Sequence, residues 1–267
     1  MKYKLFISDY DGTLGGFEGI DEETVKAIKK YEKAGGKFVV CTGRMYKNIR
    51  DICENYGIAD AVASCQGARI NERKSGESLF AGEIENSLAA EVLYSIEKLP
   101  VKPAVLSEDC LYYTLNSFYT DAYKKADIVK LKRVKNLAEE VGKGIFPALK
   151  VNVICDGDYS LFDFIKNFGE KYKGRLIVNS GGPSLAEFVN PKCSKGAAVK
   201  FLANYYGINY DEIIAVGDST NDVELISGGW HGVAVGDANE ELKKHAKEIT
   251  VDYKNHPVKF LLEKYCL

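Results

Sequence analysis

The sequence predicts an α/β fold, in which a three-layer core with a mostly parallel sheet is interrupted by an inserted α+β domain. Two observations lead to this prediction. Short apolar runs, typical of buried strands, alternate with amphipathic helical segments, and this alternation gives parallel sheets with right-handed crossovers. The pattern changes near residue 83 and resumes near residue 189. We therefore expect a core of residues 1–82 and 189–267, with residues 83–188 as the inserted domain.

In the first half of the core, turn-forming and helix-capping residues separate the apolar runs. A strand that begins at Leu5 ends in two carboxylates and a glycine, and Asp21 caps a helix that ends at Gly35-Gly36. The segments that follow are a strand at 37–41, a helix at about 45–56, a strand at 61–64 and a hairpin of 68–71 with 78–80.

The inserted domain shows a different order of elements. We expect helices at 87–99 and 159–172, strands at 104–106, 111–115, 148–154 and 176–179, and a helical stretch rich in tyrosine and lysine. The core then resumes with a helix at 194–205, a strand at 213–216, a short helix at 222–226 and shorter edge strands at 232–235 and 249–251.

Composition and charge narrow the possible functions. A formal net charge of −2 gives no electrostatic footprint for nucleic acid or an anionic membrane. Seven cysteines without a C-x-x-C pair indicate reduced thiols, hence a cytoplasmic protein. No apolar run approaches the roughly 18 residues of a membrane span, and we expect no secretion. The expected partner is a small molecule, not nucleic acid or a membrane, and the protein is expected to be a monomer or a homodimer.

Asp9 and Asp11 stand at the carboxyl end of the first strand, where ligands bind in open α/β sheets. They are two positions apart, so both lie on one side of a continuing strand, and Gly12 then allows the chain to turn. Two carboxylates this close repel each other unless a cation or a shared proton intervenes. A divalent metal with a nucleophile explains the pair. The alternative is a solvated strand end before a turn. Without further motifs, an Asp-x-Asp-Gly segment favours this alternative.

Three further motifs follow Asp9-Tyr10-Asp11-Gly12-Thr13 along the chain. They are Val40-Cys41-Thr42-Gly43-Arg44, Ser194-Lys195-Gly196 and Val216-Gly217-Asp218-Ser219-Thr220-Asn221-Asp222. In this order the four resemble the motifs of the haloacid dehalogenase-like (HAD) phosphatase superfamily. The long stretch between the second and third motifs resembles the large type IIB cap of the Cof-type subfamily. The resemblance implies a Rossmann-like core with an inserted cap that selects the substrate.

The resemblance also implies roles for the acidic residues. Asp9 is the expected nucleophile, which takes the phosphoryl group, and Asp11 is the expected general acid and base. Side-chain ligation of a metal by Asp11 is the alternative to that role. Mg²⁺ is the implied cofactor. Its expected ligands are the Asp9 carboxylate, the Asp11 backbone carbonyl and the Asp218 carboxylate, while Asn221 and Asp222 orient the metal's waters or Lys195.

Phosphoryl transfer depends mainly on positioning and charge stabilisation. Lys195 stands in the first turn of a predicted helix, where the helix dipole disfavours a cation, and this conflict favours a functional role for Lys195. Lys192 and Lys200 are the nearby alternatives, but Lys195 carries the Lys-Gly match to the superfamily motif. The expected phosphoryl-binding residues are Gly12, Thr42, Gly43 and Lys195, with Arg44 as a further candidate.

Two segments depart from the superfamily pattern. Gln66-Gly67 stands where relatives commonly have Asn-Gly, and the segment from Tyr253 to Val258 replaces a Glu-Asp-Gly-Val pattern. Both changes put inherited substrate assignments in doubt. Four tyrosines of the inserted domain either stack on a sugar or base or simply pack, and packing is the commoner role; they are Tyr112, Tyr113, Tyr119 and Tyr123.

We therefore expect a Mg²⁺-dependent phosphatase that hydrolyses a small phosphorylated metabolite, foremost a sugar phosphate, through an aspartyl-phosphate. A phosphomutase would pass the same phosphoryl group to a second hydroxyl. A receiver-type signalling module would keep it on the aspartate, but Asp11 and the inserted domain argue against this. A metabolite-binding protein without turnover is disfavoured because every motif residue of the chemistry is present.

Overall fold

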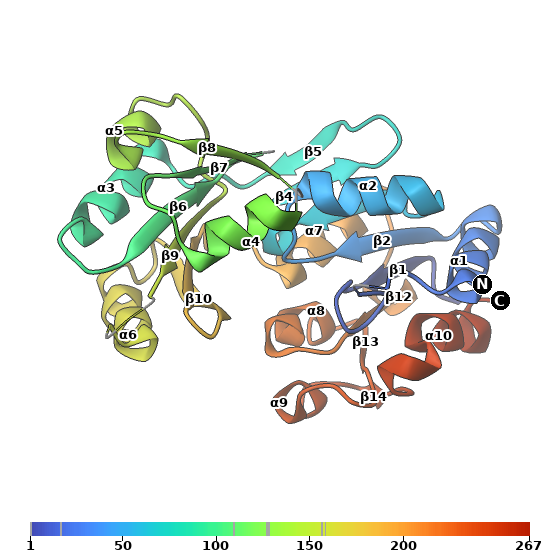
Figure 1. Cartoon of the computed structure of the whole chain (residues 1–267). Helices are drawn as coiled ribbons and strands as arrows, with labels where there is room; N and C mark the ends of the chain where they lie inside the picture. Colours follow the sequence, from blue (N-terminus) through green and yellow to red (C-terminus); the bar gives the residue numbers. More distant parts are fainter. Residues whose placement is uncertain (1, 17, 109, 127–128, 156, 158) are drawn as a thin grey trace. The chain divides into compact units, whose positions relative to one another are not determined.

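The protein contains two β-sheets, one in each of two units (Figure 1). The computed structural model describes residues 2–16, 18–108, 110–126, 129–155, 157 and 159–267. The first unit comprises Met1–Arg44, Ile49–Phe80 and Ser194–Leu267, and the second comprises Met45–Asn48 and Ala81–Cys193.

The sheet of the first unit has eight strands and is mostly parallel. Its strands are β1 (Leu5–Ser8), β2 (Lys37–Cys41), β3 (Ala61–Ser64), β4 (Arg69–Glu72), β5 (Ser78–Ala81), β12 (Ile213–Gly217), β13 (His231–Ala234) and β14 (Glu248–Ile249). Their order is β14-β13-β12-β1-β2-β3-β4-β5, with β3 and β4 antiparallel. Every residue of β1 and β12 is buried, as expected for central parallel strands covered on both faces.

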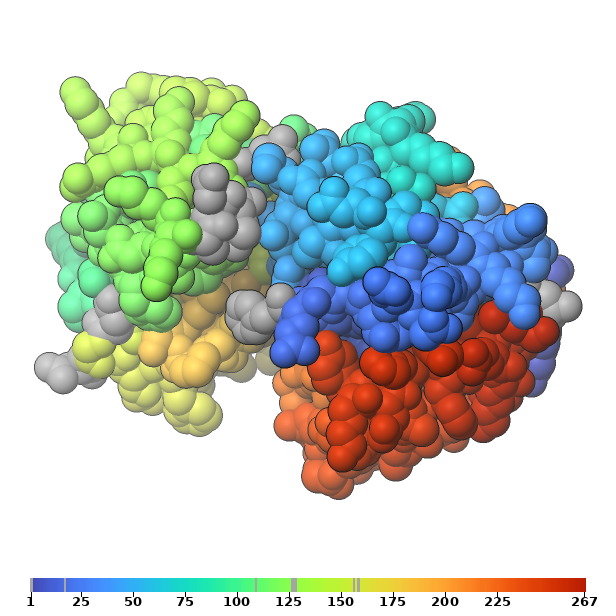
Figure 2. Space-filling model, turned by 45° about the vertical axis from the view of Figure 1, so that its right-hand side comes forward, coloured from blue at the N-terminus to red at the C-terminus, as the bar shows by residue number. Residues whose placement is uncertain are grey.

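Helices and short 3₁₀ turns follow these strands. The α-helices are α1 (Glu22–Lys33), α2 (Tyr46–Tyr56), α7 (Lys195–Tyr206), α8 (Val223–Ile226), α9 (Glu240–Lys243) and α10 (Pro257–Tyr265); the 3₁₀ turns are η1 (Cys65–Gly67), η2 (Tyr210–Glu212), η3 (Thr220–Asp222) and η4 (Tyr253–Asn255). The Asp21 side chain caps α1, and the Ser194 hydroxyl caps α7 by accepting from the Ala197 amide. Helices α1 and α10 pack together, so the blue and red ends of the chain lie side by side (Figure 1 and Figure 2).

The second unit contains a six-stranded sheet, and three of its described helices pack against one face. Its strands are β6 (Lys102–Leu106), β7 (Cys110–Tyr113), β8 (Lys130–Arg133), β9 (Lys150–Ile154), β10 (Ile177–Gly182) and β11 (Leu185–Val189), in the order β10-β11-β9-β6-β7-β8. Its helices are α3 (Asn86–Ile96), α4 (Phe118–Ala126), α5 (Leu137–Gly142) and α6 (Leu161–Lys171). Side chains of α3, α5 and α6 form an apolar core with Val151, Val153 and Phe188 of the sheet.

The predicted α/β class, with a Rossmann-like, mostly parallel sheet and a separate mixed sheet, is confirmed. The element list is incomplete, because β8, α5 and β11 were not predicted. Strand β11 lies between two turn-forming segments, Ser180–Pro183 and Asn190-Pro191, which hid a five-residue strand. The prediction of 232–235 as an edge strand is wrong, since β13 lies between β12 and β14. Among the described residues, no helix has the length and apolar character needed to cross a bilayer.

Candidate active site

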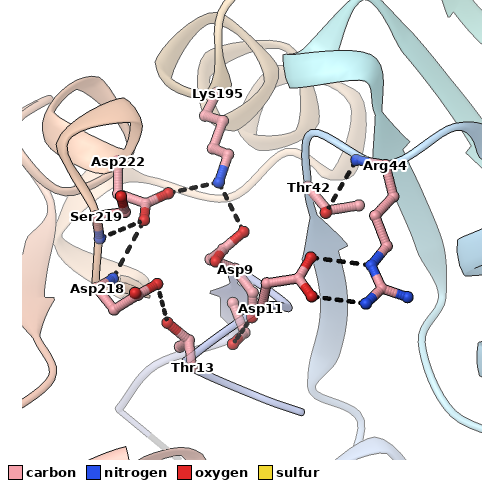
Figure 3. A network of polar contacts seen from close by, with 10 residues as sticks. Asp9, Asp11, Thr13, Thr42, Arg44, Lys195, Asp218, Ser219 and Asp222 are labelled. Carbon is pink, nitrogen blue, oxygen red and sulfur yellow. Dashed lines mark hydrogen bonds and ion pairs between the residues drawn. The ribbon is translucent and has the colours of Figure 1, made fainter. Parts of the chain in front are cut away.

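The carboxyl ends of three neighbouring strands meet at one edge of the first unit's sheet. The register pairs Ser8 of β1 with Val40 of β2 on one side and with Val216 of β12 on the other. The residues that follow these strands, Asp9, Thr42 and Asp218, are therefore delivered to the same edge (Figure 3).

Lys195 lies at the centre of this edge. From the first turn of α7 its Nζ donates to Asp9 Oδ1 at 2.6 Å and to Asp222 Oδ1 at 2.5 Å, and all three side chains are buried (Figure 3). Burial opposes the charged form of Lys195, but the two carboxylates outweigh it and raise the pKa of the ammonium above its ordinary value. The lysine therefore stays protonated.

Asp222 also fixes the loop that follows β12. Its second oxygen, Oδ2, accepts hydrogen bonds from the backbone amides of Asp218 at 3.1 Å and Ser219 at 3.0 Å. Both oxygens of Asp222 are thus engaged by protein groups. A Cβ on Gly217 would lie 2.5 Å from the Asp222 side chain, so this residue must be glycine for the loop to close.

The carboxylates form a candidate metal site. Oxygens of Asp9, Asp218 and Asp222 all lie within 4.8 Å of one another. Burial raises the pKa of Asp9 well above its ordinary value, against the lowering effect of Lys195, and burial also raises the pKa of Asp218. Three clustered carboxylates with one lysine favour an added cation or proton. Hard carboxylate oxygens suit Mg²⁺, and since Asp222 is already engaged, Asp9 and Asp218 are the better ligands.

Two residues of the first loop lie against Asp218 of this cluster. The Thr13 hydroxyl donates to Asp218 Oδ1 at 3.1 Å. Gly12 adopts a φ of +76°, and a Cβ there would lie 2.7 Å from Asp218 Oδ2. The sequence argument placed Thr13 in the motif without giving it a role. Its hydroxyl follows the two carboxylates of that motif closely in the sequence, and this could have indicated a hydrogen bond to an acidic residue of the site.

The Asp11 side chain points away from the acidic cluster and pairs with Arg44 (Figure 3). Arg44 donates from Nε to Asp11 Oδ2 at 2.9 Å and from Nη2 to Oδ1 at 2.6 Å. The guanidinium carbon also lies 4.5 Å from the centroid of the Tyr10 ring. The Asp11 side chain remains 55% exposed, so it stays open to a ligand at the strand ends.

The Thr42–Arg44 loop closes against the turn that follows β3. Thr42 is buried, and its hydroxyl accepts from the Arg44 amide at 3.2 Å. Gln66 donates its backbone N–H to the Thr42 carbonyl at 2.9 Å. A Cβ on Gly43 would lie 2.8 Å from Gln66 Nε2, so the glutamine carboxamide lies directly against the loop. Cys65 and Gln66 both adopt positive φ, an uncommon backbone for such residues.

Some predicted residues lie outside this network. Asn221 is exposed in η3 and makes no hydrogen bond with the network formed by the described residues. Four residues of the segment from Tyr253 to Val258 line a cavity of about 410 Å³ together with Thr13 and Asp21, namely Tyr253, Lys254, His256 and Val258. In the second unit, the Tyr112 ring stacks on Phe146 with centroids 3.6 Å apart, which is a packing role.

The sequence of the chain matches a family model along most of its length. A model of the haloacid dehalogenase-like hydrolases matches residues 6–262. The chain belongs to this family. The predicted resemblance to the HAD superfamily and its Cof-type branch is thereby confirmed, as is the expectation of a hydrolase.

Other members of the HAD family resemble the chain over its whole length. Phosphatase YwpJ of Bacillus subtilis is 27% identical over 97% of this chain and 99% of its own. A 5-amino-6-(5-phospho-D-ribitylamino)uracil phosphatase of the same organism is 25% identical over 98% of this chain and 97% of its own. A crystal structure from Thermotoga maritima has the same fold, with a TM-score of 0.86 at 24% identity, and covers 99% of this chain and 98% of its own.

Proposed function

We propose that this HAD-family hydrolase is a Mg²⁺-dependent phosphatase that hydrolyses a small phosphorylated metabolite, foremost a sugar phosphate, through an aspartyl-phosphate. The observation that carries the proposal is the buried contact of Lys195 with Asp9 beside Asp218. A lone lysine among three carboxylates suits a site that receives both a divalent cation and a phosphate dianion. The phosphatases among the relatives support the reaction class.

Asp9 performs the first displacement in this proposal. One of its carboxylate oxygens attacks phosphorus, the bond from phosphorus to the leaving oxygen breaks, and Asp11 gives that oxygen its proton. Water then attacks the aspartyl-phosphate, Asp11 takes a proton from it, and the bond from Asp9 to phosphorus breaks to release inorganic phosphate. Bound Mg²⁺, held by Asp9 and Asp218, would offset the repulsion between the carboxylates and the phosphoryl oxygens.

The remaining motif residues hold the phosphoryl group. The Thr42 hydroxyl and the Gly43 amide supply donors, and Lys195 supplies positive charge. The Gly12 amide, a third expected donor, already donates to the Gly15 carbonyl at 3.1 Å and must give up or share that bond to reach phosphate. Arg44 positions Asp11 through its two hydrogen bonds and is a further candidate for contact with the phosphoryl group. Asp222 positions Lys195 and the loop at Asp218.

The two parts of the chain divide the work in this proposal. Residues 1–82 and 189–267 perform the chemistry, and residues 83–188 select the leaving group. The position of every catalytic candidate in the first unit supports this division. A relative whose name specifies a phosphorylated ribityl group supports a sugar or polyol phosphate as the substrate class. The seven cysteines form no disulfide among the described residues, which supports a reducing compartment such as the cytoplasm.

The test is phosphate release from a panel of sugar phosphates, polyol phosphates, nucleotides and p-nitrophenyl phosphate, with Mg²⁺ and with EDTA. We expect turnover that needs Mg²⁺ and is lost in Asp9→Asn, but not in Asp211→Asn, which changes an exposed aspartate of η2. Acid-stable, hydroxylamine-labile phosphate on the protein during turnover would identify the aspartyl-phosphate. Transfer of phosphate to a sugar hydroxyl would indicate a mutase, and a phosphorylated protein that persists for hours would indicate a signalling module.

A further inference from the structure

The turn that follows β3 has an uncommon backbone. Cys65, Gln66 and Gly67 have φ values of +50°, +60° and +84°, so three consecutive residues lie in the left-handed region. Glycine adopts this region freely, and asparagine, aspartate and histidine are the other residues enriched there. Glutamine is not among them. Strain of this kind persists only where the surrounding structure enforces it, and it is concentrated at functional sites.

One side of this left-handed turn, Cys65–Gly67, is hydrogen-bonded to the Thr42–Arg44 loop. The Cys65 amide donates to the Arg44 carbonyl at 2.8 Å, and the Gln66 amide donates to the Thr42 carbonyl at 2.9 Å. Both bonds are made by the backbone, so they fix the course of the turn whatever its side chains are. The loop that would hold the phosphoryl group therefore also holds the strained residues in place.

The other side of the left-handed turn packs against the first turn of α7. The carbonyl oxygen of Ser194, which caps this helix, leaves no room for a Cβ on Gly67, and the Ala198 methyl would lie 3.1 Å from such an atom. Lys195 follows Ser194 directly in the chain. The turn therefore joins the two elements that would hold the phosphoryl group, namely the Thr42–Arg44 loop and the start of α7.

The Gln66 carboxamide lies at this junction with its donor group toward Gly43. A Cβ on Gly43 would lie 2.8 Å from Gln66 Nε2 but 3.9 Å from Oε1. The Gln66 side chain is half-buried, and within the described part of the chain its carboxamide forms no hydrogen bond. A costly backbone conformation thus presents an uncommitted amide donor beside the Gly43 amide.

The other donors assigned to the phosphoryl group are largely engaged by the protein. The engaged donors and their partners are the Gly12 amide with the Gly15 carbonyl, Arg44 with Asp11, and Lys195 with Asp9 and Asp222. A phosphate dianion has several strong acceptor oxygens and is bound through charge-assisted hydrogen bonds. An uncommitted donor next to Gly43 meets this need without disturbing an existing contact.

We propose that the Gln66 carboxamide donates a hydrogen bond from Nε2 to the bound phosphoryl group, beside the Gly43 amide. The left-handed turn keeps the side chain at this position although its backbone conformation opposes folding. The proposal adds a phosphate-binding residue to the proposed phosphatase and in that respect rests on the proposed function.

A direct test is possible because Gln66 is the only glutamine among the 267 residues. Protein made with glutamine labelled with ¹⁵N in the carboxamide gives one pair of side-chain N–H signals. We expect one of these proton signals to move downfield when orthophosphate saturates the Mg²⁺-loaded protein, relative to Mg²⁺ alone. A signal that stays in place at saturation, or a protein to which orthophosphate does not bind in calorimetry, would overturn the proposal.

Two substitutions separate the hydrogen bond from packing against Gly43. Gln66→Met keeps the length of the side chain without a donor, and we expect the Kd of orthophosphate to rise about tenfold, as for the loss of one hydrogen bond to a charged group. Gln66→Glu keeps the shape but adds a carboxylate, so repulsion should raise the Kd about a hundredfold. Asn204→Asp is the control, because it adds the same charge at an exposed position of α7.

Equal orthophosphate affinities of wild type and both folded variants would mean that Gln66 only packs against the loop. The spectrum of the labelled protein uses the unaltered chain, so it decides even if neither variant folds. Hydrolysis of monoesters with an unmoved carboxamide signal would retain the phosphatase and remove the contact. A carboxamide that binds orthophosphate in a protein without turnover would retain the contact and remove the phosphatase.

Discussion

The guanidinium of Arg44 holds the Asp11 carboxylate at two points, from Nε to Oδ2 at 2.9 Å and from Nη2 to Oδ1 at 2.6 Å (Figure 3). Two parallel hydrogen bonds fix the plane of the carboxylate as well as its distance. The Tyr10 ring beneath the guanidinium limits its movement further. In the proposed reaction, the pair therefore sets the direction from which Asp11 approaches the leaving group.

We expect Arg44→Lys to lower kcat/KM by about tenfold, because an ammonium retains the charge but cannot hold the carboxylate at two points. Steady-state kinetics of phosphate release measure the effect. Arg175→Lys is a matched control, since Arg175 forms the same two-point contact with Glu91 on the second unit, at 3.0 and 2.6 Å. Equal losses in both variants would mean that the effect is not local to Asp11.

The sequence was sufficient to predict which strand ends would meet. Apolar runs before Asp9, Thr42 and Asp218 are visible in the chain, and parallel strands with right-handed crossovers leave little freedom for their order. The place of Lys195 followed from its motif and from its conflict with the helix dipole. These features depend on periodicity and chain topology, which a single sequence carries.

The contact partners of individual side chains could not be predicted from the sequence, because they depend on rotamers and on which distant segments come close in space. Nothing in the sequence pairs Arg44 with Asp11, which are 33 positions apart, or places the Gln66 carboxamide against Gly43. The pairing of Glu187 with Asn152 was missed for a similar reason. Glu187 belongs to β11, a strand that the sequence argument did not contain, so its pairing with Asn152 had no place in the predicted sheet.

Lys195→Met should destabilise the folded protein in EDTA by about 3 kcal/mol at pH 8, because Asp9 and Asp222 then lose their buried cation. The loss should shrink toward pH 5. Without the lysine, buried Asp9 holds a proton that the unfolded chain has released, so stability falls as pH rises. Urea unfolding measures both values, with Lys200→Met, an exposed change on the same helix, as control. A pH-independent loss would contradict the argument.

Glu32 gives a pH effect that is independent of the active site. Burial, assisted by the nearby charge of Asp60, raises its pKa from 4.5 to about 7. Between these values the folded state binds more protons than the unfolded state, so stability falls as pH rises through this window. We expect Glu32→Gln to be more stable than wild type at pH 8 and to lose this advantage near pH 4.5.

Thermal unfolding at several pH values tests the effect of Glu32. Glu263→Gln serves as the control, since it makes the same substitution at an exposed glutamate of α10. A Glu32→Gln advantage of the same size at pH 4.5 and at pH 8 would show that the substitution acts through packing rather than through the proton.

Gly12→Ala tests the metal side of the cluster. The new Cβ would lie 2.7 Å from Asp218 Oδ2 at a φ of +76°, so the carboxylate must move. We expect Mg²⁺ affinity, measured by calorimetry, to fall about tenfold, as for other changes that displace a ligand's support.

Gly35→Ala is the control that separates the clash with Asp218 from backbone strain, because Gly35 has a φ of +93° but no atom within 4 Å of the added Cβ. It should lose stability by about 1 kcal/mol through backbone strain alone and bind Mg²⁺ like wild type. Equal Mg²⁺ affinities for both variants would mean that Asp218 is not a ligand of the metal.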